Sequence, residues 1–434
     1  MLKAVPMSAP VDLLSELEAR GLLYQTTDRA AFSAHLGQGS RSVYGGFDPT
    51  GDSLTIGNLV PLLLLRRFQL AGHRPFALVG GGTGLIGDPS GKDAERPIRD
   101  RDDVAHNVAR IRSIFERILD FSGPSGAVLV DNADWLLKLS YVEVLRDVGK
   151  HFSVNMMIQK DSVRERLQNR EQGISYTEFS YMLLQAYDFL HLFRAHGVTA
   201  QVAGSDQWGN TVAGIDLIRR TERTEAFGMT VPLITKADGG KFGKTEAGAV
   251  WLSADRTSPY EFYQFWLNAT DVDAKRFLAI YTFLPLPEIA RIAAEHAEDP
   301  GARLAQRTLA AEVTRIVHGQ AGLERAEAAT QALFSGEVRA LPEDALRELF
   351  ASAPSTTLPL GRLAAPGAAI VELLVEGGVV KSKREAREFL EQGAISVNGE
   401  RATTSSSFSA EALLFGQMLL VRRGKKSWHV LRFE

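Results

Sequence analysis

The chain has 434 residues, enough for about three domains. Its composition is ordinary for a globular protein, since 45% of the residues are hydrophobic and 23% are charged, and this excludes collagen-like, coiled-coil and wholly disordered classes. The 49 Lys and Arg and the 52 Asp and Glu give a formal charge of −3. Any nucleic-acid site must therefore be a local basic patch.

The sequence contains no Cys, which excludes disulfide frameworks, thiolate zinc sites and a cysteine nucleophile. The apolar run at 59–65 is far shorter than the roughly 18 residues that a membrane span needs. Residues 1–10 lack the apolar core of a signal peptide. We therefore expect a cytoplasmic chain with no membrane partner.

Short apolar segments alternate with amphipathic helices between residues 40 and 250. The pattern predicts strands at 42–47, 75–80, 127–130 and 199–202, with helices such as 59–71 and 104–119 between them. Such alternation is typical of an α/β fold with a parallel sheet and right-handed crossovers. Ligands of these sheets bind at the carboxyl ends of the strands, so we expect the site there.

The composition and the predicted secondary structure change after residue 257 and again after residue 350. From 258 to 350 strand signals are absent, and stretches rich in Ala, Leu, Glu and Arg predict helices. Residues 351–366 contain Ser, Thr and Pro with little periodicity, which indicates a linker. Residues 367–434 predict a small α+β domain with two short helices and a tight strand-turn-strand at Asn398 and Gly399. The expected domains are therefore 1–257, 258–350 and 367–434.

A glycine-rich loop follows the second predicted strand. The glycines of 82–87 match the dinucleotide fingerprint G-x-G-x-x-G. That motif needs its last glycine inside an opening helix, and Pro89 disfavours a helix at the residue before it. A P-loop is also excluded, because Asp93 replaces the required Ser or Thr. The loop either admits close approach of a polar ligand, beside Asp88 and Lys92, or is a plain surface loop.

A second candidate site precedes the first long helix. The run 44–50 (Tyr-Gly-Gly-Phe-Asp-Pro-Thr) leads to 55–58 (Thr-Ile-Gly-Asn) and then to an apolar helix. We expect Asn58 to be the N-cap of that helix. A helix amino end beside Gly and Thr is an anion-binding site, although an ordinary helix cap explains the same residues.

A third candidate is a polar stripe on the otherwise apolar helix predicted at 177–190. Tyr181, Gln185 and Asp188 stand at i, i+4 and i+7, within about 60° of one helix face. Buried polar groups need partners, so the stripe either forms an internal hydrogen-bond network or lines a cup for a polar ligand. Tyr44 and Asp188 could together donate to and accept from a phenolic hydroxyl.

Two further segments carry groups suited to a nucleotide. Asp206, at the end of a predicted strand, either holds a ribose or caps a helix. Lys241 and Lys244 lie in a glycine-containing loop at 239–245. Their ammonium groups either close on a polyphosphate and stabilise its developing charge or are solvated surface charges.

Together these segments make the chain similar to the bacterial tyrosyl-tRNA synthetases, a class I family, over residues from about 12 to 434. The run 55–58 resembles the family's HIGH signature, and 241–245 (Lys-Phe-Gly-Lys-Thr) resembles its KMSKS signature. The other similar blocks are 44–50, 83–90, 181–188 and 204–210. Six blocks in the family's order are specific, although each is weak by itself.

The resemblance implies a Rossmann-type catalytic domain with a parallel sheet, an α-helical anticodon-region domain and a small α+β RNA-binding domain of the ribosomal-protein type. Residues 381–387 and 393–400 are similar to the helix-turn-strand of that last domain. The domain carries ten Lys and Arg against eight Asp and Glu, with basic residues grouped at 381–387 and 422–426. The family also implies a homodimer, for which 135–157 is the expected interface.

The implied reaction joins tyrosine and ATP into tyrosyl-adenylate and pyrophosphate, and then passes the tyrosyl group to the terminal adenosine of tRNA(Tyr). ATP would bring Mg²⁺ on its phosphates, with no organic prosthetic group and no metal ligated by the protein. The carboxylate attacks the α-phosphorus in line, so positioning and charge stabilisation carry the catalysis.

The resemblance also implies roles for individual residues. It places Tyr44 and Asp188 at the phenol of tyrosine. The other residues implied for the tyrosine site are Thr83, Asp88, Tyr181 and Gln185, the last three at the amino group. Residues implied to bind ATP or to assist the chemistry are Gly46, Asp48, Thr50, Thr55, Gly57, Asn58, Lys92, Gly204, Asp206, Gln207, Lys241, Lys244 and Thr245, with Asp206 at the ribose.

The first signature departs from the family at two positions. Thr55 and Asn58 replace the two His of HIGH with shorter side chains, which bears on the rate of activation more than on the function. The candidate phosphate ligands that remain are Thr50, Lys92, Lys241 and Lys244. Two other hypotheses stay open: a tryptophan-specific relative, whose indole matches Tyr44 and Asp188 poorly, and an RNA-binding paralogue without catalysis.

Overall fold

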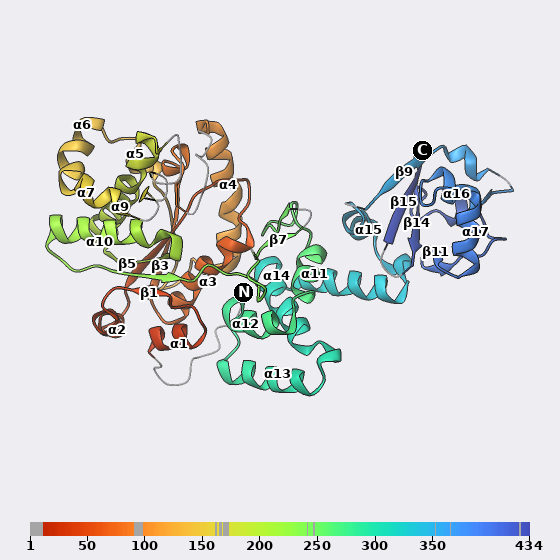
Figure 1. Ribbon diagram of the computed structural model, residues 1–434, viewed down its shortest axis with the longest axis horizontal. Helices are drawn as coiled ribbons and strands as arrows, with labels where there is room; N and C mark the ends of the chain where they lie inside the picture. The colour runs from red at the N-terminus through yellow and green to blue at the C-terminus, as the bar shows by residue number, and fades with distance from the viewer. Residues whose placement is uncertain are drawn as a thin grey trace. The chain divides into compact units, whose positions relative to one another are not determined.

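The computed structural model describes residues 12–90, 99–160, 163–164, 167, 173–240, 242–245, 248–351, 353–364, 366–424 and 427–434, with only the backbone of Lys244 and Thr245. The chain forms two compact units, each built on its own larger sheet (Figure 1). The first unit contains Met1–Thr257 and Phe265–Gly319. The second contains Ser258–Gln264 and Gln320–Glu434.

The first unit is built on a six-stranded sheet of order β1-β6-β5-β2-β3-β4. Its strands are β1 (Gln25–Thr26), β2 (Ser42–Phe47), β3 (Arg74–Val79), β4 (Val128–Asp131), β5 (Val198–Gly204) and β6 (Phe227–Val231). β2 pairs in parallel with β3 and β5, β3 with β4, and β5 with β6, which confirms the predicted α/β fold. The edge strand β1 is antiparallel to β6, an exception to the predicted parallel arrangement. Two residues are too few to show strand periodicity.

Helices flank this sheet on both faces. A Cβ added to Gly45 of β2 would contact Leu65 at 3.3 Å, whereas the ring of the preceding Tyr44 packs on Phe189 with centroids 5.0 Å apart. Because adjacent side chains of a strand point to opposite faces, the helices that carry Leu65 and Phe189 cover opposite faces. The helices are α1 (Leu13–Ala19), α2 (Arg29–Gly37), α3 (Ile56–Leu70), α4 (Arg101–Ile118), α5 (Ala133–Leu136), α6 (Tyr141–Glu143), α7 (Val154–Ile158), α9 (Tyr176–His196) and α10 (Trp208–Glu222).

The expected helices of the middle region are present. They are α11 (Pro259–Leu267), α12 (Asp271–Tyr281), α13 (Leu286–Glu298) and α14 (Leu304–Ser335). Gly319 interrupts α14 with φ 74° and ψ 178°, a conformation that suits glycine, and the first compact unit ends there. The two units therefore divide the region expected to be one helical domain, 258–350. In the described part of the chain, no helix combines the length and the hydropathy needed to cross a membrane.

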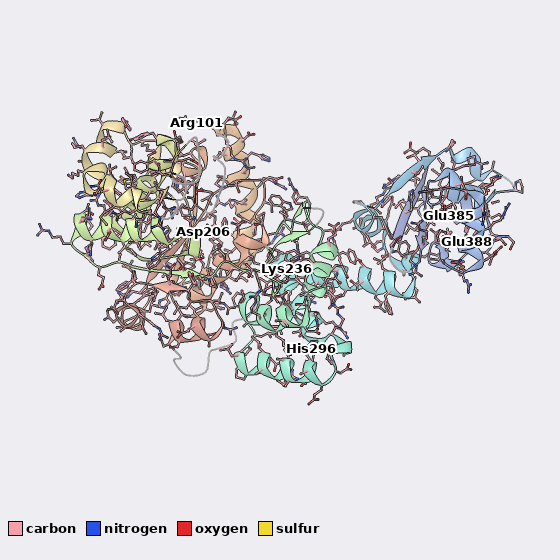
Figure 2. All side chains as sticks on the ribbon, in the orientation of Figure 1. Arg101, Asp206, Lys236, His296, Glu385 and Glu388 are labelled. Carbon is pink, nitrogen blue, oxygen red and sulfur yellow. The ribbon has the colours of Figure 1, made fainter. Side chains whose placement is uncertain are left out.

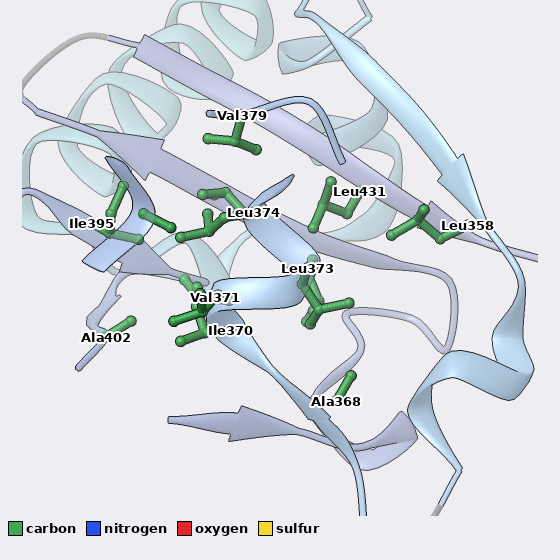
Figure 3. Packing of buried hydrophobic residues seen from close by; sticks show 14 of the residues in the cluster. Leu358, Ala368, Ile370, Val371, Leu373, Leu374, Val379, Ile395, Ala402 and Leu431 are labelled. Atoms are coloured by element: carbon green, nitrogen blue, oxygen red, sulfur yellow. The ribbon is translucent and has the colours of Figure 1, made fainter. Parts of the chain in front are cut away.

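The second unit holds a five-stranded sheet of order β12-β11-β14-β15-β9. Alternate residues of β14 enter two cores. Leu419 and Val421 belong to the cluster drawn in Figure 3, which includes residues of both α16 and α17, whereas Leu420 packs with Leu346 of α15. The elements of this unit are α15 (Glu343–Leu349), α16 (Ile370–Glu376), α17 (Lys383–Glu391), β9 (Ser355–Leu358), β10 (Ala368–Ala369), β11 (Ile395–Val397), β12 (Glu400–Arg401), β13 (Ser407–Phe408), β14 (Met418–Arg423) and β15 (Ser427–Phe433).

The segment expected to be a linker, 351–366, contains a strand of this sheet. β9 pairs in parallel with β15, with Ser355 opposite Val430 and Leu358 opposite Phe433. Of the four residues in β9 only Leu358 is buried, as befits an edge strand. An edge strand with one buried side chain gives no alternating apolar pattern, so the composition resembled that of a linker.

The predicted tight turn lies between β11 and β12. Asn398 has φ 50° and Gly399 has φ 91°, the left-handed pair that a type I′ hairpin requires. The Asn398 side chain is also a structural bridge, because it accepts from the Leu420 amide and donates to the Ala412 carbonyl, both at 2.8 Å. A Cβ on Gly399 would lie 1.6 Å from the carbonyl oxygen of Gly336, so glycine is needed for packing as well as for conformation.

Candidate active site

A carboxylate at the carboxyl end of β2 links the glycine-rich loop to helix α9. Asp48 Oδ2 accepts a hydrogen bond from the Tyr181 hydroxyl, and its Oδ1 accepts one from the Thr83 hydroxyl, both at 2.8 Å. Tyr181 lies on α9 and Thr83 follows β3. The site therefore lies at the strand ends, where a parallel sheet places its ligands.

The network continues across the sheet through Asn132, at the end of β4. Its amide nitrogen donates to Thr83 Oγ1 and to Asp188 Oδ2, each at 2.9 Å. The indole nitrogen of Trp135 donates to the other oxygen, Asp188 Oδ1, at 2.7 Å. Asn132 Oδ1 accepts from the Gly82 amide at 2.7 Å, so a single buried amide connects the loop to the acid on α9.

Burial controls the charges at this end of the site. It raises the pKa of Asp188 to about 8, although the hydrogen bonds from Asn132 and Trp135 act in the opposite direction. Burial, together with the charge of nearby Asp188, raises the pKa of Tyr44 well above its usual value. Within the described residues, the buried Tyr44 hydroxyl has no hydrogen-bond partner. Buried polar groups without partners are rare in native proteins, so this hydroxyl indicates a place for a ligand.

The glycine-rich loop has glycines because carboxylates approach its backbone. A Cβ on Gly80 would lie 2.0 Å from Asp48 Oδ1, and one on Gly81 would lie 2.2 Å from Asp131 Oδ1. The Gly81 amide instead donates to that Asp131 oxygen at 3.0 Å. The loop contains a 3₁₀ turn, Thr83–Leu85, and the described residues from there to Ser90 form no α-helix, which agrees with the exclusion of the dinucleotide fingerprint.

A second polar cluster joins the glycine-rich loop to the end of β5. Gln207 Nε2 donates to Asp88 Oδ2 at 2.6 Å and to Asp206 Oδ2 at 3.3 Å. Asn210 donates to Gln207 Oε1 at 3.1 Å and to Ser90 Oγ at 3.4 Å. Asp206, labelled in Figure 2, is exposed, whereas Asp88 is buried. The cluster therefore presents one accessible carboxylate and one that is held in place.

The start of α3 differs from the prediction, because Thr55 is the N-cap and Asn58 is the third helical residue. Asn58 Oδ1 accepts from both the backbone amide and the hydroxyl of Thr55, each at 3.0 Å. This reciprocal arrangement, a capping box, satisfies donors that the helix start would otherwise leave free. The expectation that Asn58 caps the helix is therefore wrong, since its side chain reaches back one turn.

The two signature segments lie against each other. The Ile56 amide donates to the Val250 carbonyl and the Val250 amide donates to the Gly243 carbonyl, each at 3.1 Å. A Cβ on Gly243 would be 3.7 Å from Ile56 Cβ and 4.0 Å from the Gly57 nitrogen. The chain after the 241–245 loop is thus hydrogen-bonded to the first turn of α3.

Comparison with known proteins agrees with this geometry. A family model described as "tRNA synthetases class I (W and Y)" matches residues 38–335, and one described as "Tyrosine--tRNA ligase SYY-like C-terminal domain" matches 346–431. The tyrosine–tRNA ligase 2 of Enterococcus faecalis is 50% identical over 421 residues, which cover 96% of this chain and 98% of that protein. The chain belongs to the tyrosine–tRNA ligases of class I. The tyrosine–tRNA ligase of Bacillus caldotenax is likewise 50% identical over 426 residues, 98% of this chain and 100% of that protein.

Solved structures agree with the fold of this ligase. A C-terminally truncated mitochondrial tyrosyl-tRNA synthetase of Coccidioides posadasii is 32% identical, with a TM-score of 0.65 over 73% of this chain and 91% of that one. The tryptophanyl-tRNA synthetase of Plasmodium falciparum has a TM-score of 0.53 over 77% of this chain and 87% of that one at 11% identity, so it shares the fold alone. The predicted class I fold and tyrosine–tRNA ligase activity are confirmed.

The structure brings together most of the residues predicted for the tyrosine site of the ligase. Tyr44, Thr83, Tyr181 and Asp188 are buried around the network described above. Gln185 is half-buried on α9, the same helix as Tyr181. Of the residues predicted for ATP, Gly46, Thr50, Gly57 and Asp206 are exposed, Asp48, Thr55, Asn58, Gly204 and Gln207 are half-buried, and Lys244 and Thr245 form β7. The predictions for Lys92 and Lys241 lie outside the described residues.

Asn132 is not among the residues that the sequence predicts for the site of the ligase, and Trp135 is named only as the first residue of the expected interface 135–157, which stays a prediction. Trp135 is 9% exposed and its ring stacks on His191 with centroids 4.3 Å apart. Both residues follow the strand predicted at 127–130. The rule that ligands bind at the carboxyl ends of strands could therefore have identified them from the sequence. Among the described residues, no group of three His, Asp or Glu side chains is arranged to hold a metal ion.

Proposed function

We propose that the ligase binds the phenol of tyrosine between Tyr44 and Asp188. The unpartnered hydroxyl of Tyr44, buried beside a carboxylate, is the observation that carries this proposal. The substrate hydroxyl donates to Asp188 and accepts from Tyr44, which satisfies both protein groups at once. Phenylalanine leaves the buried Tyr44 hydroxyl without a partner and offers no donor to Asp188, and that cost gives the discrimination.

The amino group of tyrosine binds toward Asp88, Tyr181 and Gln185. Two observations support this end of the proposal: Asp48 fixes the Tyr181 hydroxyl, and Gln207 fixes Asp88. An ammonium group surrounded by carboxylate and hydroxyl oxygens makes charge-assisted hydrogen bonds. Gln185, half-buried on the same helix as Tyr181, supplies a further polar group to the substrate.

ATP binds between the start of α3 and the 241–245 loop. The exposed Gly57 lies in the first turn of α3, where backbone N–H groups and the helix dipole favour phosphate, and Lys241 and Lys244 supply positive charge. Asp206 holds the ribose. Mg²⁺ enters on the phosphates of ATP. Catalysis consists of aligning the tyrosine carboxylate with the α-phosphorus and stabilising charge on the leaving pyrophosphate.

We also propose that the ligase is a homodimer joined through the segment around 135–157, which includes α6 and most of α7. Large apolar side chains are exposed there, and such a patch on a soluble protein marks an interaction site. The exposed residues are Leu137, Tyr141, Val142, Leu145, Val154, Met156 and Ile158. Val142 is 71% exposed, so Val142→Glu should leave the monomer folded but shift sedimentation from dimer to monomer. An unchanged dimer would place the interface elsewhere.

The phenol site is tested by Tyr44→Phe. Because the Tyr44 hydroxyl has no partner among the described residues, removing it should not lower the melting temperature of the free protein. Tyrosine affinity should fall about tenfold, whereas phenylalanine affinity should stay the same or rise. Tyr181→Phe is the matched control, because it removes a hydroxyl that does have a partner and should lower stability as well. Unchanged tyrosine affinity in Tyr44→Phe would overturn the assignment.

A further inference from the structure

The loop that joins β2 to α3 carries Thr50, one of the candidate phosphate ligands. Thr50 is exposed, but the backbone around it is hydrogen-bonded. Its amide donates to the Asp48 carbonyl at 2.8 Å, and its carbonyl accepts from Arg99 Nη2. The preceding carbonyl, that of Pro49, accepts from Asn107 Nδ2 at 3.1 Å. Because Asn107 lies on α4 and Arg99 lies two residues before that helix, α4 supports one side of the loop.

The next residues of the loop lie against the segment 251–256. Both carboxylate oxygens of Asp52 accept from Arg256 Nη1, at 3.0 and 3.2 Å. The guanidinium of Arg256 also lies over the Trp251 ring, with its central carbon 4.6 Å from the ring centroid. A Cβ added to Gly51 would lie 3.4 Å from the same ring. Arg256 therefore lies between an aromatic face and a carboxylate, which both attract a cation.

The two supports of the loop are also linked to each other. Arg110 of α4 forms an ion pair with Asp255, the neighbour of Arg256. The Ser253 amide donates to Ser53 Oγ at 3.1 Å, which adds a further contact between this segment and the loop. The loop, the segment and α4 are therefore connected pairwise, so that each limits the movement of the other two.

The ion pair of Arg256 and Asp52 contributes little to the fold itself. The two side chains are 42% and 29% exposed, and exposed ion pairs add little to the stability of a protein. The pair does restrict the backbone two residues after Thr50, where the free energy of unfolding is not the quantity at stake. A contact that is weak for folding but lies next to a candidate phosphate ligand indicates a role in positioning that ligand.

We propose that Arg256 is a positioning residue for the activation step, whose contacts with Asp52 and Trp251 hold the loop so that Thr50 meets the phosphates of ATP. This inference rests on the proposed ATP site. Arg256 touches no substrate and acts through Thr50. Without it the loop keeps its contacts with α4 but loses its main support on the other side, and misplacement by about 1 Å can lower a rate about 10²-fold.

The first test measures single-turnover formation of tyrosyl-adenylate over a range of ATP concentrations, together with tyrosine affinity. Arg256→Ala should slow the activation step about tenfold with unchanged tyrosine affinity, because part of the loop support remains. Arg256→Lys keeps a cation beside Asp52 and Trp251 and should recover to within about threefold of the wild-type rate.

Arg29→Ala is the matched control for the loss of an exposed ion pair. Arg29 pairs with Glu18 at 2.7 Å in the same unit, and its side chain is 45% exposed. Both alanine variants should melt close to the wild-type temperature, since each loses only a surface pair. Equal activation rates for Arg256→Ala and Arg29→Ala would overturn the proposal. A slow Arg256→Ala that also melts well below Arg29→Ala would mean that Arg256 supports the fold, which would overturn it as well.

The second test asks whether Arg256 acts through Thr50. Thr50→Ala should slow activation, and the addition of Arg256→Ala should have little further effect, because both changes remove the same contribution of Thr50. Asp52→Ala should match Arg256→Ala, and the variant with both changes should be no slower than either alone. If the effects of Thr50→Ala and Arg256→Ala multiply, Arg256 acts elsewhere and the proposal is overturned.

The two levels of the proposal fail in different ways. If Thr50→Ala activates tyrosine at the wild-type rate, the place of Thr50 in the ATP site is wrong and the role of Arg256 falls with it. If Thr50→Ala is slow and Arg256→Ala is fast, the ATP site stands and only the positioning role of Arg256 is refuted.

Discussion

The indole nitrogen of Trp135 lies 2.7 Å from Oδ1 of Asp188 and donates a hydrogen bond to it. Asn132 holds the other oxygen at 2.9 Å, so the two donors fix the plane of the carboxylate from the protein side. A carboxylate oxygen can accept more than one hydrogen bond, which leaves capacity for a substrate hydroxyl. Trp135 thereby sets the direction in which Asp188 faces the proposed phenol site.

Trp135→Phe should weaken tyrosine binding about tenfold, since it removes one charge-assisted hydrogen bond that orients Asp188. The new ring can still stack on His191, as Trp135 does with centroids 4.3 Å apart, so the fold should persist. Trp428→Phe, in the second unit, is the control for loss of an indole. Titration calorimetry measures the tyrosine affinity. An unchanged affinity in Trp135→Phe would show that Asn132 alone is enough to orient the carboxylate of Asp188.

The burial of Asp188 predicts a proton released on binding. Its pKa of about 8 in the free protein means that the carboxyl is mostly protonated at pH 7. A phenol that donates to the ionised carboxylate requires that proton to leave, so tyrosine affinity should rise with pH up to about 8 and then level off. Calorimetry at pH 7 in two buffers of different ionisation enthalpy should show nearly one proton released. Release of the same proton by Asp188→Asn would mean that another group titrates.

Lys244→Ala should slow adenylate formation roughly 10²-fold with little change in tyrosine affinity, because the loop meets phosphate charge mainly in the transition state. Lys236→Ala, at a lysine labelled in Figure 2 that lies outside the signature, should leave both quantities unchanged. Rapid-quench kinetics and equilibrium binding separate the two effects. If Lys244→Ala lowers only the affinity for tyrosine, the lysine acts on tyrosine and not on ATP, which would contradict the proposal.

The organisation of the second unit predicts where the chain can be cut. A chain ending at residue 319 keeps every residue that we propose binds tyrosine or ATP. It should therefore form tyrosyl-adenylate but charge tRNA poorly. A chain ending at 360 keeps β9 but loses β14 and β15, which exposes the core around Leu346 and Phe350. It should therefore bind a hydrophobic dye more strongly than the shorter chain. Equal charging of tRNA by the 319-residue chain and the full chain would contradict the expectation that the domain at 367–434 binds RNA.

The sequence located the central strands well because they are nearly continuous apolar runs. The structure has β2 at Ser42–Phe47, as predicted, and β4 shifted by one residue from 127–130. The polar network was only partly predictable. Periodicity placed Tyr181 and Asp188 on one face of α9, but the contacts of Asp188 with Asn132 and Trp135 join residues more than 50 positions apart. No local pattern carries that information.

The basic residues grouped at 381–387 and 422–426 are a second feature that the sequence predicted only in part. Arg423 donates to the Val379 carbonyl at 3.0 Å and lies over the Phe389 ring, and Arg422 lies over the Trp428 ring, so these cations serve packing within the unit. In the first basic group, Lys383 pairs with Glu372 at 3.0 Å but stays exposed. Counting charges in the sequence could not separate cations that pack on aromatic rings from cations that stay accessible. Those left exposed on α17 include Arg384 and Arg387, on the same helix as Glu388 (Figure 2).

The most direct test of the phenol site is ATP–pyrophosphate exchange by the full chain, run with tyrosine, phenylalanine or tryptophan as the amino acid and repeated with Asp188→Asn. If the Tyr44 and Asp188 pair selects the phenol, the wild-type protein exchanges with tyrosine and barely with the other two. The Asp188→Asn variant should lose most of its preference for tyrosine over phenylalanine. Exchange that depends equally on tryptophan, or an unchanged preference in Asp188→Asn, would contradict the proposed site.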